Sequence, residues 1–159
     1  MKIDILAVGK IKEKYFTDAI DEYSKRLSRY IKLSVIEVKD EKTPDNASQH
    51  EKELIMDKEG ERLSKYIDEN AYIIPLCIEG KQKSSDEFSE MITGLETNGK
   101  SHIQFIIGGS LGLCDSIKQR GSCHLSFSKM TFPHQLMRVV LLEQIYRAYK
   151  IKNNEPYHK

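Results

Sequence analysis

The sequence lacks the basic excess that is typical of a protein binding naked RNA on its own. Its 159 residues include 25 lysines and arginines and 24 aspartates and glutamates, so the formal net charge is only +1. A nucleic-acid partner would therefore have to bind a local basic patch on this protein. Alternatively, it would be recognised largely through its shape, within an assembly that contains other proteins. The length is that of one domain, which can bury a core without disulfides.

Cysteine is scarce and long apolar runs are absent. The three cysteines, Cys77, Cys114 and Cys123, are an odd number in irregular positions. No apolar run approaches the roughly 20 residues that cross a bilayer, and the first residues run into a strand-like segment rather than a signal peptide. We therefore expect a cytoplasmic protein with reduced thiols and no membrane anchor. The pair Cys123–His124 has no second ligand pair at zinc-site spacing, so we expect no metal.

Internal repeats, linkers and low-complexity segments are also absent, which predicts a single domain over residues 1–159. Strand-like and helix-like segments alternate along the chain. The predicted strands are Ile3–Val8, Leu33–Val38, Ala71–Ile78, Ile103–Ile107 and His124–Phe127. The predicted helices are Tyr15–Tyr30, His50–Tyr66, Ser85–Glu96, Asp115–Arg120 and a long one from Pro133 or His134 to Lys152. This order predicts an α/β domain with a mostly parallel sheet and helices on both faces.

Pro75 lies inside the third predicted strand. Proline cannot donate to a strand ladder, so this strand should end, bulge or lie at an edge near Pro75. The polar segment Glu79–Lys83 is predicted to be a turn. Ser85 is then expected to cap the next helix, with Asp86 and Glu87 at the positive end of its dipole.

Three strand ends carry candidate binding loops. In open α/β sheets, ligands bind at the carboxyl ends of the strands. Leu76–Gly80 follows the third predicted strand, Gly108–Leu113 the fourth and Phe127–Phe132 the fifth. If these strands are neighbours, their loops form one cleft.

The loop Gly108–Gly112 has the sequence GGSLG. Glycine lets backbone N–H groups approach a ligand closely, so this loop could cradle phosphate. The common phosphate fingerprints are missing, however, since the spacing is not G-x-G-x-x-G and no G-K-[ST] follows. Local evidence favours a tight turn that needs positive φ.

The loop Ser126–His134 has the sequence SFSKMTFPH and mixes hydroxyls, a lysine and two aromatics before Pro133, which is well placed to open a helix. Such a loop could wrap a flat purine with backbone groups and apolar walls. An ordinary strand-to-helix loop with a packed phenylalanine is the alternative.

The predicted last helix is apolar on nearly every face over Leu136–Ile145. A helix of this kind must be buried all round, and in so small a domain that favours a subunit interface. Arg138, Glu143 and Arg147 interrupt the apolar run. The alternative for these three is an i to i+4 pair with a surface arginine, and for Arg138 this alternative is as good as a functional role.

The tail Glu155–Lys159 is polar, aromatic and basic. Most terminal tails are frayed, which is the simpler interpretation. His158 nevertheless belongs to the residue type that titrates near neutrality, so a functional tail stays open.

Taken together, these segments resemble the RlmH family of ribosomal RNA large subunit methyltransferases, in the SPOUT superfamily. The resemblance covers essentially the whole chain. Its parts are KIDILAVGKIKEKYF (Lys2–Phe16), Gly108–Leu113, Leu125–His134, QLMRVVLLEQIYRAYKI (Gln135–Ile151) and the terminal PYHK (Pro156–Lys159). The combination is specific, although no single piece would be.

The resemblance implies an α/β sheet with a C-terminal trefoil knot, an exception to the usual topology rules. It also implies a homodimer that transfers a methyl group from S-adenosylmethionine to N3 of a pseudouridine in 23S rRNA, on the assembled ribosome. That substrate fits the weak net charge, because the ribosome can supply most of the docking surface.

Two groups of site residues follow from the resemblance, position by position. The cofactor site would comprise Leu76, Gly108, Phe127, Ser128, Lys129, Met130, Thr131 and Phe132. The substrate side would comprise Glu143, Arg147, Tyr157 and His158, with the tail reaching the partner subunit's cofactor. Arg147 could stabilise a developing uracil anion, and His158 or Glu143 could accept the proton or route it to water.

Two functions from other classes remain as alternatives. One is an α/β nucleotide-binding module that uses Gly108–Gly112 on phosphate, which calorimetry with ATP and with S-adenosylmethionine would separate. The other is a non-catalytic ribosome-associated dimer, which methyl incorporation into rRNA would exclude.

Overall fold

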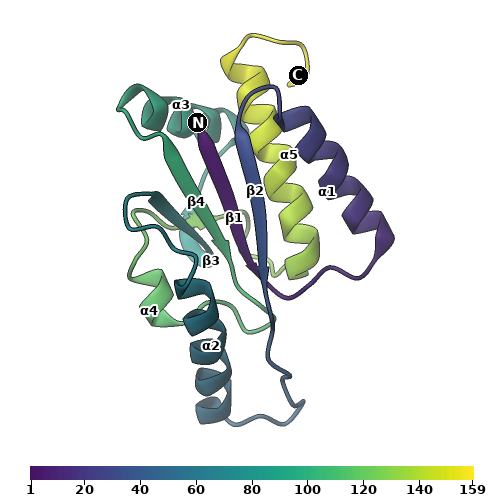
Figure 1. Ribbon diagram of the computed structural model, residues 1–159, viewed down its shortest axis with the longest axis vertical. Helices are drawn as coiled ribbons and strands as arrows, with labels where there is room; N and C mark the ends of the chain where they lie inside the picture. The colour runs from purple at the N-terminus through teal and green to yellow at the C-terminus, as the bar shows by residue number, and fades with distance from the viewer.

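The computed structural model describes residues 1–159 and has one five-stranded sheet in the order β2-β1-β4-β3-β5 (Figure 1). All neighbouring strands are parallel, so the predicted α/β class is confirmed. The strands are β1 (Lys2–Val8), β2 (Lys32–Val38), β3 (Tyr72–Gln82), β4 (His102–Ile107) and β5 (Leu125–Ser126). The helices are α1 (Lys14–Leu27), α2 (Gln49–Ser64), α3 (Ser85–Thr97), α4 (Asp115–Lys118) and α5 (His134–Lys152). The trefoil knot stays a prediction.

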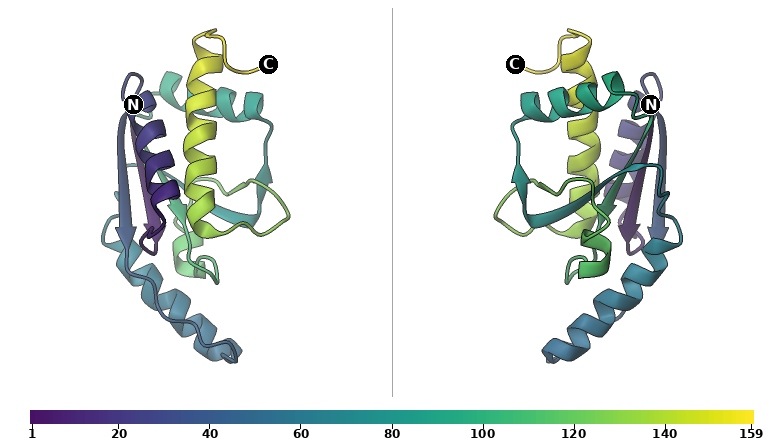
Figure 2. Two further views of the ribbon diagram at one scale, coloured as in Figure 1. Left: turned by 90° about the vertical axis from the view of Figure 1, so that its right-hand side faces the viewer. Right: turned by 90° about the vertical axis from the view of Figure 1, so that its left-hand side faces the viewer.

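Each face of the sheet has its own apolar core, because successive side chains of a strand point to opposite faces. Ile3 and Ile5 of β1 belong to the larger core, which α1, α3 and α5 cover. Leu6 belongs to the smaller core, with Leu63 of α2 and Ile117 of α4. The predicted helices on both faces are therefore confirmed. Figure 2 shows α5 running beside α1 and α3, while α2 extends beyond the carboxyl ends of the strands.

Strand β3 changes partner at Pro75. Its pairing with β4 ends at Pro75, opposite Ile106, and its pairing with β5 shifts register between Leu76 and Lys81. The predicted irregularity at the proline is thus confirmed. The predicted turn over 79–83 is wrong, because β3 continues to Gln82 and the Lys81 N–H donates to the His124 carbonyl at 3.0 Å. The polar sequence of residues 79–83 did not indicate that β5 would pair with this part of β3.

The start of α3 differs by one residue from the prediction. Ser84, rather than Ser85, is the N-cap, and its hydroxyl accepts a hydrogen bond from the Glu87 N–H at 3.1 Å. The Glu87 carboxylate accepts one from the Ser84 N–H in return. This reciprocal capping box satisfies two N–H groups at once, which favours Ser84 over its neighbour.

Helix α5 packs one face against its own chain, where eight of its residues are buried by the sheet, α1 and α3. Leu136, Val139 and Val140 on the rest of the helix stay partly exposed. The expected subunit interface therefore stays a prediction.

Arg138 of α5 is fully buried and is no surface arginine. Its guanidinium donates to the Glu37 carboxylate at 2.5 Å and to the carbonyls of Val8 and Gly9 at 2.7 Å each. These contacts fasten the first turns of α5 to the carboxyl ends of β1 and β2, and so fix one edge of the region described next.

No helix in the structure has the length and apolar character of a membrane span.

Candidate active site

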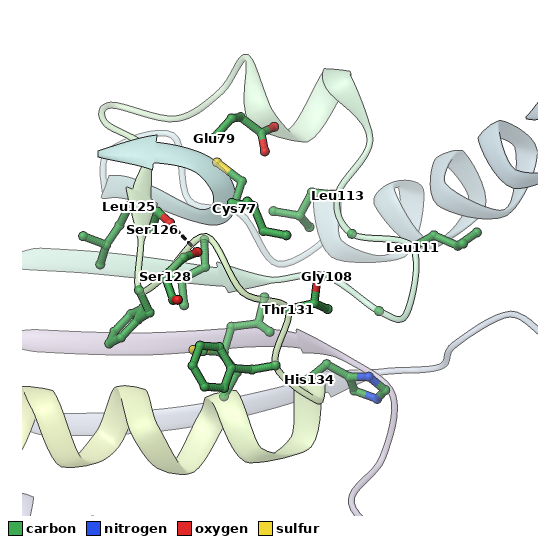
Figure 3. Close-up of a pocket in the computed structure, with 18 of the residues that line it drawn as sticks. Cys77, Glu79, Gly108, Leu111, Leu113, Leu125, Ser126, Ser128, Thr131 and His134 are labelled. Carbon is green, nitrogen blue, oxygen red and sulfur yellow. Dashed lines mark hydrogen bonds between the residues drawn. The ribbon is translucent and has the colours of Figure 1, made fainter. Parts of the chain in front are cut away.

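A cavity of about 670 Å³ lies at the carboxyl ends of β4 and β5 and beside the middle of β3, just after Pro75 (Figure 3). The three strands are neighbours, so the strand ends that the sequence singled out do form one cleft. The volume is within the range of small-molecule sites, roughly 300–1,000 Å³. Half of its 22 lining residues are hydrophobic, and one wall consists of the glycine loop Gly108–Gly112.

The glycine loop is a tight turn and a cavity wall at the same time. A Cβ on Gly108 would lie 2.5 Å from the Gly112 carbonyl carbon, so only glycine fits there. Gly112 has a φ of +89°, in the left-handed region that favours glycine. Its N–H donates to the Gly109 carbonyl at 3.1 Å. The turn that local evidence favoured is confirmed, and its backbone also faces the cavity.

The loop after β5 forms the opposite wall. The Ser126 hydroxyl donates to the Ser128 carbonyl at 3.0 Å, and the Ser128 hydroxyl accepts from the Met130 N–H at 3.0 Å. These short-range bonds shape the loop without tertiary partners. Met130 is 74% exposed and Phe132 38% exposed, so two large apolar side chains lie at the mouth of the cavity.

Seven of the eight predicted cofactor residues line the cavity. They are Leu76, Gly108, Phe127, Ser128, Met130, Thr131 and Phe132. Lys129 is exposed and does not line it. Cys77 and Glu79 of the predicted loop Leu76–Gly80, and His134 of the loop after β5, also line it. Lys118 of α4 and Met137 of α5 line it as well, and no local pattern in the sequence had singled them out.

The cavity wall carries one ion pair and no activated nucleophile. Lys118 and Glu79 are 2.5 Å apart, and this contact lowers the pKa of Glu79 and raises that of Lys118. Burial, and then the Glu79 charge, raise the pKa of the Cys77 thiol, which therefore stays protonated. Burial, and then Arg138, lower the pKa of His134, which favours its neutral form. These groups suit binding better than covalent catalysis.

The four predicted substrate-side residues lie together at the end of α5. Glu143 Oε1 accepts hydrogen bonds from Arg147 Nη2 at 2.6 Å and from the Tyr157 hydroxyl at 3.1 Å. The Arg147 guanidinium lies over the Tyr157 ring, 4.8 Å from its centre, and its Nη1 donates to His158 Nδ1 at 3.1 Å. The tail is packed against the helix, so the frayed alternative is wrong. We call these four residues the tail cluster.

The contacts of the tail cluster set its protonation states. Burial, together with Tyr23 and Glu143, raises the pKa of Tyr157 to about 12, so its hydroxyl donates at neutral pH. Arginine has no acceptor, which means that His158 Nδ1 must be the acceptor in its contact with Arg147. The imidazole proton is then on Nε2, which faces Asp86 at 3.6 Å.

The tail cluster lies further along α5 than the cavity within one chain. Met137 is the last residue of α5 that lines the cavity, and Glu143 and Arg147 follow it by six and ten residues. At 1.5 Å per residue these are about 9 and 15 Å along the helix axis. Figure 2 shows the C-terminus beside the far end of the helix. One chain therefore does not bring the two predicted groups of site residues together.

The structure has no group of three or more His, Cys, Asp or Glu side chains that could hold a metal ion.

The fold and the cavity define a class of protein: a parallel α/β domain with a small-molecule site at the carboxyl ends of its strands. Within that class, the chain belongs to the SPOUT methyltransferase family, because the family described as "Predicted SPOUT methyltransferase" matches residues 1–158. The methyltransferase activity that the sequence predicted is thereby confirmed.

Curated relatives match over the entire chain. The protein from Bifidobacterium adolescentis (strain ATCC 15703) is 61% identical, that from Clostridium novyi (strain NT) 59% and that from Clostridium kluyveri (strain ATCC 8527) 57%. Each alignment covers 159 residues, which is 100% of both chains. All three relatives carry the name "Ribosomal RNA large subunit methyltransferase H". The predicted membership of the RlmH family is therefore confirmed.

Proposed function

We propose that this protein methylates ribosomal RNA of the large subunit, with S-adenosylmethionine as the methyl donor. The observation that carries the proposal is the match, end to end and at 57–61% identity, to relatives named for that reaction. A cavity of suitable size at the strand ends supports it, because a methyltransferase must hold a small donor next to a large acceptor. An acceptor on the ribosome implies a cytoplasmic location.

The walls of the cavity fit such a donor. The backbone at Gly108, Gly109 and Gly112 offers polar groups without side chains in the way, which suits close hydrogen bonding to an adenosine. Leu76, Phe127 and Phe132 offer apolar surface for the purine. When bound, S-adenosylmethionine supplies a reactive methyl group on a sulfonium, so the protein's main tasks are alignment and the exclusion of water.

The tail cluster supplies the chemistry that the acceptor needs. The proposed acceptor is N3 of a pseudouridine in 23S rRNA, which carries a proton at neutral pH and must lose it. Arg147 would turn toward a uracil oxygen and stabilise the developing anion. That movement would free His158 Nδ1 to accept the proton, directly or through water. Glu143, already the acceptor for Arg147 and Tyr157, would hold the cluster in place.

The reaction requires two copies of the chain in this proposal. Reacting atoms must approach to about 3–3.5 Å, whereas Glu143 and Arg147 lie about 9 and 15 Å along α5 from Met137, the nearest residue of the helix that lines the cavity. A homodimer in which the tail of one copy lies at the cavity of the other would remove this separation. The trefoil knot that the family resemblance implies would lie in this C-terminal part of the chain.

We expect assembled ribosomes or large subunits to be methylated at least about ten times faster than protein-free 23S rRNA. A net charge of +1 gives the protein little long-range attraction to a bare phosphate backbone. The measurement is incorporation of labelled methyl groups, with mass spectrometry of the modified nucleotide. Equal rates on both substrates would contradict the ribosomal substrate, and absence of methylation on every rRNA would refute the proposed function.

Mixed dimers should test the composite site. A Gly108→Ala copy has a defective cavity, and a copy without residues 156–159 has a defective tail. Each parent should be nearly inactive alone, yet a mixed dimer has one cavity and one tail intact and should recover up to about half of the wild-type activity per dimer. Sedimentation analysis of the wild type should show a dimer at micromolar concentration. A stable monomer, or no recovery in mixed dimers, would argue against two copies sharing a site.

A further inference from the structure

Helix α2 carries a carboxyl group in an unusual position. Most of this helix is solvent-exposed, but Glu59 is only 4% exposed. Its Oε1 accepts a hydrogen bond from the Glu41 N–H at 3.0 Å, and its Oε2 has no partner. Burial raises the pKa of this carboxyl. Unpartnered buried polar atoms are uncommon in folded proteins, which indicates that the position has a use.

The Glu59 carboxyl lies against the glycine loop from outside the cavity. A Cβ on Gly109 would lie 3.0 Å from Glu59 Oε2 and 3.3 Å from Oε1, with Val8 Cγ1 at 3.1 Å. Gly109 lines the cavity and Glu59 does not. The absence of a side chain on Gly109 therefore lets a buried carboxylate approach the backbone of the loop.

Glu59 itself is held firmly. Arg62, one turn further along α2, donates to the Lys39 carbonyl at 2.8 Å and forms an ion pair with Glu41. These contacts join α2 to the connection that follows β2, which also donates to Glu59 through the Glu41 N–H. Gly60 packs against Cys114, the N-cap of α4, two residues beyond the glycine loop. The buried turn of α2 thus contacts the loop at Gly109 and the chain just after it.

We propose that Glu59 is a positioning residue for the methyl donor: it holds the glycine loop in its binding geometry, and its Oε2 accepts a hydrogen bond from a loop N–H when the donor is bound. The inference rests on the proposed function and names a residue that acts through the loop rather than by contact with the donor. Its physical basis is the unused acceptor, already desolvated and fixed, next to a backbone that contacts the cavity. Such an acceptor gains a partner at little conformational cost.

Substitution of Glu59 tests this role through binding. Glu59→Met keeps the length of the side chain but removes both acceptors, whereas Glu59→Gln keeps one oxygen for the Glu41 N–H and places an NH2 donor at the position of Oε2. In calorimetry with S-adenosylmethionine we expect both variants to weaken binding at least about tenfold, because neither offers the loop N–H an acceptor. KM for the donor should rise in parallel, while kcat at saturating donor and KM for ribosomes stay within about twofold. Glu61→Gln, an exposed carboxyl on the same helix, is the matched control and should bind as the wild type does.

A second pair of variants approaches the contact from the loop. Gly109→Ala and Glu59→Asp should each weaken donor binding at least about fivefold, the first by crowding the carboxyl and the second by withdrawing it. Because the shorter side chain makes room for the new methyl group, the double variant should bind no worse than Gly109→Ala alone. Additive losses, or wild-type affinity in Glu59→Met, would overturn the proposal. Wild-type protein that does not bind the donor would instead refute the proposed function.

Discussion

Replacing Gly108 with alanine is expected to lower the affinity for S-adenosylmethionine at least about a hundredfold, a factor of the size that a misplacement of about 1 Å costs in catalytic rate. The new Cβ would lie 2.5 Å from the Gly112 carbonyl carbon, 2.6 Å from its oxygen and 2.9 Å from the Leu113 nitrogen. All three are backbone atoms, which cannot rotate away as a side chain would. The turn must therefore open, and with it the wall of the cavity that it forms.

The matched control for this substitution is Gly94→Ala. Gly94 lies inside α3, and a Cβ there would meet no atom within 4 Å. Alanine is also the better helix former, so this variant should be at least as stable as the wild type and bind the donor equally well. Calorimetry gives the affinities, and thermal unfolding shows whether each variant is folded. Wild-type affinity in folded Gly108→Ala would remove the glycine loop from the donor site.

Deleting residues 156–159 should lower single-turnover methyl transfer to ribosomes at least about a hundredfold, the low end of what a positioned acid–base group contributes. The deletion removes Tyr157 and His158, and with them the ring under Arg147 and the partner of its Nη1. Glu143 and Arg147 remain as an isolated pair on α5. Donor affinity should stay within about threefold of the wild type, because the walls of the cavity are intact and the tail cluster acts on the acceptor in this proposal.

Single substitutions in the tail cluster divide this loss among its members. His158→Ala should lose nearly as much as the deletion if the imidazole takes the proton, and clearly less if it only orients Arg147. Tyr157→Phe keeps the ring over Arg147 and removes the donor to Glu143, so it reports on positioning alone. Full activity in the truncated protein would leave the tail as packing and would end the assignment of the tail cluster to catalysis.

Several features of the fold could be predicted from short stretches of sequence. The alternation of apolar segments gave all ten elements and the parallel α/β class, since strand and helix periodicity are local properties. Pro75 marked the place where β3 leaves β4, because a missing N–H matters wherever the strand lies. The cleft followed from a general rule on strand ends, and the family from motifs spread over the whole chain.

Other features depend on which elements pack together, and no local pattern contains that information. The second half of β3 is a strand only because β5 lies beside it, and one face of α5 is buried because α1 and α3 flank it. Arg138 and Glu59 look like surface residues in the sequence, yet both are buried by segments that are distant along the chain. The separation of the tail cluster from the cavity likewise arises from the straight course of α5. The sequence by itself determined the elements, the cleft-forming loops and the family, whereas tertiary packing alone decided which charged groups are buried and which site residues one chain can bring together.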